Sequence, residues 1–157
     1  MDNIDEPRLS GGDRAADEAA IRALLDRQIS SWNAGDPVGY ASAYTLGGDC
    51  VSFLGGHHRG REAIAASSEV PRAGSLFRRL LRCARLHVEL TGLRFITPDV
   101  AVVHAMCSVT TGSRPTRRNR RTNTSVAVRT ADGWLLAATQ NTTQRPFTET
   151  LIRRLVS

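Results

Sequence analysis

Apolar residues recur at helical spacing near the N-terminus of the chain. The stripe consists of Ile21, Leu24, Leu25, Ile29 and Trp32, and it predicts an amphipathic helix that faces a core. Gln28 falls within the same stripe. A polar side chain on a buried face needs a partner from the protein, from water or from a ligand. We therefore regard Gln28 as a candidate ligand-orienting residue.

Residues 33–37 end this helix and begin a second one. Gly35 suits the left-handed position after a helix, Asp36 suits an N-cap, and Pro37 suits the first helical position. The second helix is expected to be short and to place Tyr40 and Tyr44 one turn apart on the same side. The pattern therefore predicts a tight pair of helices.

Short strands and turns dominate the remainder. We expect a strand over 50–54, a glycine turn at 55–56, an extended segment over 57–59 and a third helix over 61–66, then strands over 86–90, 100–110, 122–130 and 134–143. Helices followed by strands indicate an α+β fold, here a curved antiparallel sheet with three N-terminal-half helices over its concave face. Such a cone-shaped arrangement predicts a ligand cavity. The strand at 100–109 is apolar on both faces, so we expect both faces to be covered.

The domain organisation follows from length and composition. The 157 residues suffice for one domain, expected over 16–145, with a disordered lead-in at 1–15 and a weakly amphipathic, helix-like tail at 146–157. No run of 18 apolar residues and no secretory signal is present, so a cytoplasmic protein without a membrane segment is expected. The three cysteines are odd in number and unpaired in spacing, which is typical of buried thiols in a reducing compartment.

The basic residues and their distribution limit the possible chemistry and indicate the charge of a partner. All 21 basic residues are arginine, and the absence of lysine excludes Schiff-base chemistry and a P-loop. The net charge of +6 is uneven: residues 1–36 are acidic overall, whereas residues 37–157 are strongly basic. A basic C-terminal part suits an anionic partner.

Several motifs in this order resemble a known family. They are the segments 31–36 (SWNAGD), 60–64 (GREAI), 98–104 (PDVAVVH) and 132–134 (DGW) followed by 137–142 (AATQNT). Over residues 16–145 the chain resembles the nuclear transport factor 2-like (NTF2-like) superfamily, and within it the SgcJ/EcaC branch near the SnoaL-like polyketide cyclases of enediyne and polyketide gene clusters. The resemblance implies a pocket without a cofactor. This branch is often described as oxidoreductase, but the chain contains no flavin or nicotinamide motif.

The resemblance also indicates where a catalytic base should lie. Steroid-isomerase relatives carry a carboxylate on the first strand, where this chain has only Asp49 at the strand's mouth; SnoaL-like cyclases carry an acid on a late strand, where this chain has none. His104 is then the better candidate base, with Asp49 as the second catalytic candidate. His104 shares a strand face with Met106, and burial would keep it neutral. The alternative is a core histidine satisfied by backbone or tyrosine.

Further residues complete the expected pocket. The aromatic side chains Trp32, Tyr40, Tyr44 and Phe53 form either a ligand wall or simply core. Adjacent His57 and His58 point to opposite faces, so at most one enters the pocket, and a solvated rim is the alternative. The candidate orienting amides are Gln28, Asn123 and one of Gln140 and Asn141; by the resemblance we expect Gln140. We expect no metal site, because the four histidines lack ligand spacing.

Five arginines crowd the expected hairpin tip at 113–121, namely Arg114, Arg117, Arg118, Arg120 and Arg121. A solvated loop is one interpretation. The other is docking of an anionic partner, in this family context an acyl carrier protein. Nucleic-acid binding is less favoured because no aromatic residues are interleaved.

Two functional hypotheses follow. The first is a cofactor-independent cyclase, isomerase or dehydratase acting on a hydrophobic, polyketide-like intermediate. The alternative is a non-catalytic ligand-binding or assembly module of the same fold. In either case a homodimer through the open sheet face is expected.

Overall fold

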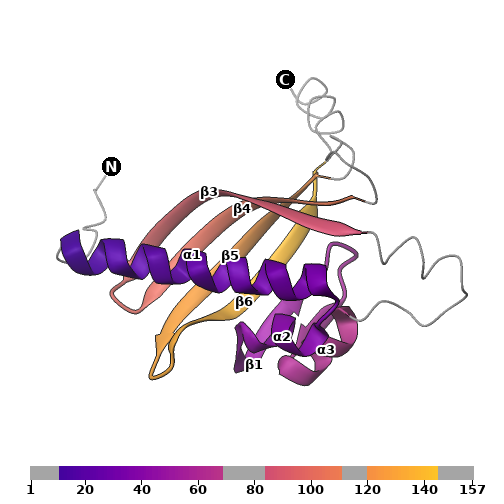
Figure 1. Cartoon of the computed structure of the whole chain (residues 1–157), viewed down its shortest axis with the longest axis horizontal. Helices are drawn as coiled ribbons and strands as arrows, with labels where there is room; N and C mark the ends of the chain where they lie inside the picture. Colours follow the sequence, from indigo (N-terminus) through magenta and orange to yellow (C-terminus); the bar gives the residue numbers. More distant parts are fainter. Residues whose placement is uncertain (1–10, 69–83, 111–119, 145–157) are drawn as a thin grey trace, which may run out of the picture.

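The computed structural model describes residues 11–68, 84–110 and 120–144 (Figure 1). Its three helices and six strands follow one another as α1 (Gly11–Ala34), α2 (Pro37–Ser42), β1 (Tyr44–Val51), β2 (His57–Arg59), α3 (Arg61–Ser68), β3 (Arg85–Thr97), β4 (Val100–Thr110), β5 (Arg120–Thr130) and β6 (Gly133–Thr143). The α+β class and the helices in the N-terminal half are as predicted.

The strands form one curved six-stranded sheet in the order β2-β1-β6-β5-β4-β3. Strands β3 to β6 form an antiparallel meander, and β2 also pairs with β1 in the antiparallel direction. Strand β1, however, runs parallel to β6. The two are joined through most of the chain rather than by a hairpin, so no tight turn imposes an antiparallel pairing. The expected sheet is thus confirmed, with one parallel pair in it.

Two faces of the sheet differ in what covers them. The inner face packs against the helices, and Figure 1 shows α1 lying across β3 to β6 with α2 and α3 beside β1. Ile21 and Leu24 of α1 and Ile64 of α3 are buried there. They pack with sheet residues at one end of the inner face, namely Phe95, Ala101, Val103, Ala127, Trp134 and Leu136. The opposite face, called the open face below, has no described helix over it.

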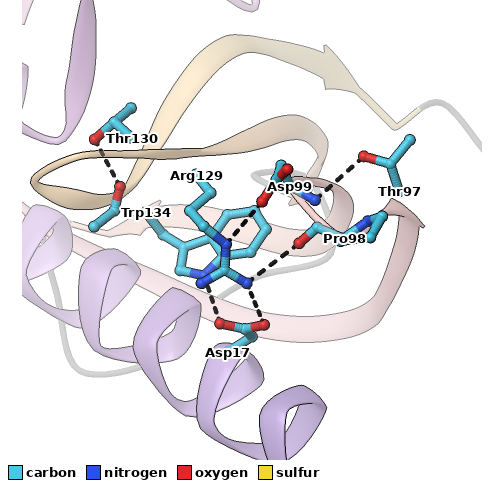
Figure 2. Close-up of polar contacts among 8 residues, drawn as sticks. Asp17, Thr97, Pro98, Asp99, Arg129, Thr130 and Trp134 are labelled. Atoms are coloured by element: carbon cyan, nitrogen blue, oxygen red, sulfur yellow. Dashed lines mark hydrogen bonds and ion pairs between the residues drawn. The ribbon is translucent and has the colours of Figure 1, made fainter. Parts of the chain in front are cut away.

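A polar network holds the first half of α1 on the β5–β6 hairpin. The Asp17 carboxylate accepts hydrogen bonds from Trp134 Nε1, at 3.0 Å, and from the Arg129 guanidinium, which also binds Asp99 at 2.9 Å (Figure 2). Asp17 is buried, and its hydrogen bond from Arg129 lowers the pKa of the carboxyl group. A buried carboxylate is stable only when paired in this way.

The Asn33 side chain fixes the other end of α1 to β3, where Arg85 Nη1 also donates to the Asn33 carbonyl at 3.2 Å. The Asn33 amide accepts from the backbone N–H of Leu86 at 2.8 Å and donates to the carbonyl of the same residue at 3.1 Å. Gly35 then takes φ of +70°, and Asp36 caps α2 by accepting from Gly39 N at 2.9 Å. The WNAGD motif therefore joins α1, β3 and α2, and the predicted capping is confirmed.

Some boundaries differ from the sequence-based expectation. Residues 11–15 are not a disordered lead-in but belong to α1. Strand β1 begins at Tyr44 rather than at 50, so Tyr44 lies on a strand and not on the second helix. The expected lead-in residues 1–10 and the tail 146–157 lie outside the described residues.

Candidate functional site

The inner face changes character along the strands. One end is the apolar core; toward Thr110 and Arg120 the inward side chains become amides, hydroxyls, a thiol and a guanidinium. The pairing registers align these side chains in neighbouring rows. We call this group, with the two phenols that reach it, the inner polar cluster: Tyr40, Tyr44, Cys107, Arg121, Asn123, Ser125, Thr139 and Asn141. Polar groups between a sheet and its helices are the informative exception to apolar burial.

Part of the cluster is internally satisfied. Ser125 Oγ donates to Asn123 Oδ1 at 2.7 Å, and Asn123 Nδ2 donates to Asn141 Oδ1 at 3.1 Å. The Tyr44 hydroxyl lies 2.8 Å from Thr139 Oγ1. These bonds fix the amides and the phenol in position, which is what a preorganised binding surface requires.

The two phenols stay protonated. Their rings lie 6.1 Å apart. Burial raises the pKa of Tyr40 to about 12 and holds the pKa of Tyr44 well above its ordinary value. Burial likewise raises the pKa of the Cys107 thiol to about 11, against the opposing effect of Arg121. At neutral pH the cluster therefore offers neutral hydroxyl donors rather than anionic nucleophiles.

Arg121 belongs to the inner face and not to an outer hairpin tip. It pairs with Cys107 and Thr143 in the sheet, and its guanidinium carbon lies 3.4 Å from the centroid of the Phe53 ring. Strand β5 begins at Arg120, earlier than expected, so strand alternation gives Arg121 the same face as Asn123 and Ser125. That alternation is the sequence signal that would have placed it. Arg120 falls on the open face.

Gln28 carries a hydrogen-bonding group without a partner. Its Nε2 atom is buried and makes no hydrogen bond in the described structure. A buried amide donor left unpaired costs about 1–3 kcal/mol. The expectation that Gln28 is available to a ligand is therefore consistent with its surroundings.

Both catalytic candidates lie on the open face. His104 is exposed, with Nδ1 3.2 Å from Thr124 Oγ1, and Met106 and Gln140 share its face. The expected burial of His104 is wrong: its strand is apolar on both faces, so periodicity did not reveal which face met the helices. The preference for Gln140 is also wrong, because Asn141 points inward beside Asn123.

The Asp49 carboxylate and the His57 imidazole form a pair at 2.8 Å. Both are well exposed, and both belong to the open face. His58 instead pairs with Cys50 and shares the inner side of the sheet. Of the two histidines it is thus His58, not His57, that the structure directs toward the helices.

The other predicted residues have varied surroundings. Trp32 is partly buried, whereas Phe53 is 40% exposed in the turn after β1. Arg114, Arg117 and Arg118 lie outside the described residues. Within the described ranges no group of three or more histidine, cysteine or acidic side chains could hold a metal ion. In the same ranges no helix combines the length and apolar character needed to cross a bilayer.

A pocket on the open face is too small for a natural-product ligand. It has a volume of about 140 Å³ and is lined by His87, Val88, Glu89, Met106, Ser108 and Arg120. Ligand sites for drug-sized molecules usually measure about 300–1,000 Å³. We therefore take the inner polar cluster, together with the unpaired Gln28 Nε2 of α1, as the candidate site.

Comparison with known proteins identifies the fold. The sequence matches no protein-family model and no curated protein. A domain of unknown function with a cystatin-like fold from Nostoc punctiforme is 25% identical, with a TM-score of 0.74 over 88% of this chain and 84% of that chain. An NTF2-like protein with a cystatin-like fold from Novosphingobium aromaticivorans is 21% identical, with a TM-score of 0.68 over 92% and 94%.

A third similar structure has a named activity. It is a candidate scytalone dehydratase from Novosphingobium aromaticivorans, 13% identical, with a TM-score of 0.67 over 85% of this chain and 88% of that chain. At this level of identity the likeness concerns the fold. The chain thus has the NTF2-like, cystatin-like fold expected from its motifs.

Proposed function

We propose that the protein binds a small hydrophobic molecule of polyketide type at the inner polar cluster, as part of secondary metabolism. The observation that carries this proposal is that donors at the inner face, Gln28 Nε2 and the Arg121 guanidinium, have no acceptor or acidic partner among the described residues. A bound oxygen atom would satisfy them. The resemblance to the SgcJ/EcaC branch and the SnoaL-like cyclases supports the choice of ligand class.

Gln28 provides the first test, because ligand binding and stability should respond in opposite directions. Gln28→Met keeps the side-chain size and removes an unpaired buried amide, so the ligand-free protein should become about 1 kcal/mol more stable. The same variant should bind β-ionone, a neutral conjugated ketone, several-fold more weakly. Urea unfolding and titration of tryptophan fluorescence measure the two effects. Unchanged binding, or a wild-type protein that binds no β-ionone, would contradict the proposal.

We further propose cofactor-independent cyclase, isomerase or dehydratase chemistry on this ligand. Tyr40 remains protonated at neutral pH, so it can donate to a carbonyl oxygen as negative charge develops there during enolisation. His58, on the inner side of the sheet, is the histidine we assign as base. His104 and Asp49 are not retained in that role because their side chains lie on the other face.

Enolisation can be measured without knowing the natural substrate. In D₂O, the wild-type protein should accelerate deuterium exchange of the acetyl methyl hydrogens of β-ionone, followed by NMR. Tyr40→Phe and His58→Ala should each reduce the exchange about 100-fold. His104→Ala, the matched histidine on the open face, should leave it unchanged. If His104→Ala loses the exchange and His58→Ala keeps it, the base is His104 and not His58.

A non-catalytic dimeric module is the second candidate. The open face favours it, because Val102, Val126 and Ala138 lie side by side there and are only partly buried in the single chain. Under this hypothesis the inner face holds a ligand without turnover, and the open faces of two copies pair. Binding of β-ionone with no exchange above buffer would favour it.

An acyl carrier protein remains our proposed macromolecular partner. It is acidic, and the basic segment that would meet it comprises Arg114, Arg117, Arg118 and Arg120. Arg121 is removed from that surface because it faces inward.

A further inference from the structure

Arg121 carries a positive charge on the inner face without an acidic partner. The ion pairs of the described residues join Arg129 to Asp17 and Asp99, and His57 to Asp49; none includes Arg121. Burial lowers the pKa of Arg121, so the loss of water around its guanidinium is not balanced by a carboxylate. The neighbouring Cys107 thiol is neutral at pH 7. A partly desolvated cation of this kind would be stabilised by an anion beside it.

The Phe53 ring fixes the orientation of this cation. The guanidinium carbon lies 3.4 Å from the ring centroid, and this stacking uses the face of the guanidinium without engaging its N–H groups. Strand β6 lies between β5 and β1 in the sheet, so the Arg121 side chain reaches the turn after β1 across the inner side of β6. Its in-plane donors are thus held over the inner polar cluster.

Asn141 supplies a second donor group beside it. Arg121 is paired with Thr143, which makes Asn141 its diagonal neighbour on the inner face, a separation of about 7–8 Å that long side chains bridge. The Oδ1 atom of Asn141 is occupied by Asn123, whereas its Nδ2 atom has no partner in the described structure. The Arg121 guanidinium and Asn141 Nδ2 are therefore both available as donors.

We propose that Arg121 and Asn141 bind the carboxylate of a conjugated or aromatic carboxylic acid at the inner polar cluster. A carboxylate accepts two parallel hydrogen bonds from a guanidinium, and a planar acid suits a cation already stacked on an aromatic ring. The apolar part of the ligand would lie toward Ala105 and Leu90, the next inward positions of β4 and β3. This inference rests on the proposed function and narrows its ligand to an anion.

A matched pair of ligands and a matched pair of arginines test it. The ligands are 2-naphthoate and the neutral ketone 2-acetonaphthone, titrated by calorimetry. The wild-type protein should bind the acid about 10- to 100-fold more tightly than the ketone. Arg121→Gln should abolish that preference by weakening the acid far more than the ketone. Arg120→Gln removes the same charge one residue away, on the open face, and should leave both affinities unchanged.

The outcomes separate the two proposals. If the wild-type protein binds both ligands equally, or if Arg120→Gln and Arg121→Gln weaken the acid equally, the carboxylate site is refuted while ligand binding at the inner face stands. If neither ligand binds at millimolar concentration, both proposals fall. Should Arg121→Gln not fold, as judged by its melting curve, Asn141→Ala takes its place and should weaken the acid several-fold more than the ketone. Equal weakening of both ligands would then refute the site.

Discussion

Asp17 shows how one side chain decides where a helix sits. It lies one turn before Ile21 on the stripe of α1 that faces the core, and it accepts from Trp134 and Arg129 of the β5–β6 hairpin. The hydrogen bond from Arg129 lowers the pKa of Asp17 below its ordinary value of 3.8. The folded state therefore prefers the carboxylate. Its contribution to stability is fully present above that value and is lost as the pH falls through the lower, folded-state pKa.

Asp17→Asn should lower the free energy of unfolding by about 2–3 kcal/mol at pH 7, because a charged hydrogen-bond acceptor is lost next to Arg129. The deficit should shrink as the pH falls below 3.8, because the unfolded wild-type chain then protonates Asp17 while the folded state resists protonation until a lower pH. Urea unfolding at pH 7 and at pH 3 measures both. Asp26→Asn, on an exposed position of the same helix, is the control and should change stability little. A deficit that does not depend on pH would refute the carboxylate's role.

The two tyrosines of the chain permit a second prediction at this scale. Burial raises the pKa of both, to about 12 for Tyr40, so the folded state prefers neutral phenols. The stability this provides is present below the ordinary value of 10.0 and is lost as the pH rises through the folded values. The absorbance at 295 nm should show almost no tyrosinate in the native protein at pH 10.5. In urea, both residues should titrate near 10. Native ionisation near 10 would place the phenols in water.

At the scale of elements, Asn33 connects α1 to β3, the edge strand of the meander. Its amide binds both backbone groups of Leu86, and the following Gly35 and Asp36 reverse the chain into α2. One short motif therefore sets the angle of α1 across the sheet and delivers Tyr40 to the inner polar cluster.

Asn33→Ala should speed hydrogen exchange at the Leu86 amide at least tenfold and lower stability by about 1–2 kcal/mol, because two hydrogen bonds are lost. Asn33→Asp retains the acceptor for Leu86 N–H and should lose about half as much. Exchange followed by NMR resolves the two variants. Equal protection of Leu86 in wild type and Asn33→Ala would show that β3 is held by other contacts.

Element order was predictable from the sequence because each helix and strand has its own periodicity and its own turn residues. It was harder to predict from the sequence which face of the sheet each residue occupies. Alternation shows that His104 and Met106 share a face, but with apolar residues on both sides of β4 it cannot show which side meets the helices. The alternation of the sequence begins this strand only at Thr122, which leaves Arg121 in the hairpin tip as a solvated or partner-docking residue, whereas β5 begins at Arg120 and turns Arg121 inward. Both errors concern which side of a sheet a residue occupies, and they depend on tertiary packing.

At the scale of the whole molecule, our proposals assign different roles to the inner and open faces. The inner face carries the donors proposed to bind a ligand. The open face carries Val102, Val126 and Ala138 at its centre, with the Asp49–His57 pair and His104 nearby in the same sheet rows. In a monomer these valines would face water at the centre of the sheet, whereas a symmetric pair of sheets would bury them.

Val126→Arg should therefore convert a dimer into a monomer, because burying an unpaired charge against its own copy is strongly unfavourable. Light scattering coupled to size-exclusion chromatography measures the mass. Leu54→Arg is the control: Leu54 is 82% exposed in the turn after β1, so the same substitution there adds the same charge away from the centre of the open face and should leave a dimer. A wild-type monomer at 100 µM would refute the pairing. If Val126→Arg remains a dimer, the interface does not include the centre of the open face. Binding of 2-naphthoate to the monomeric variant would show that the inner face works without its partner.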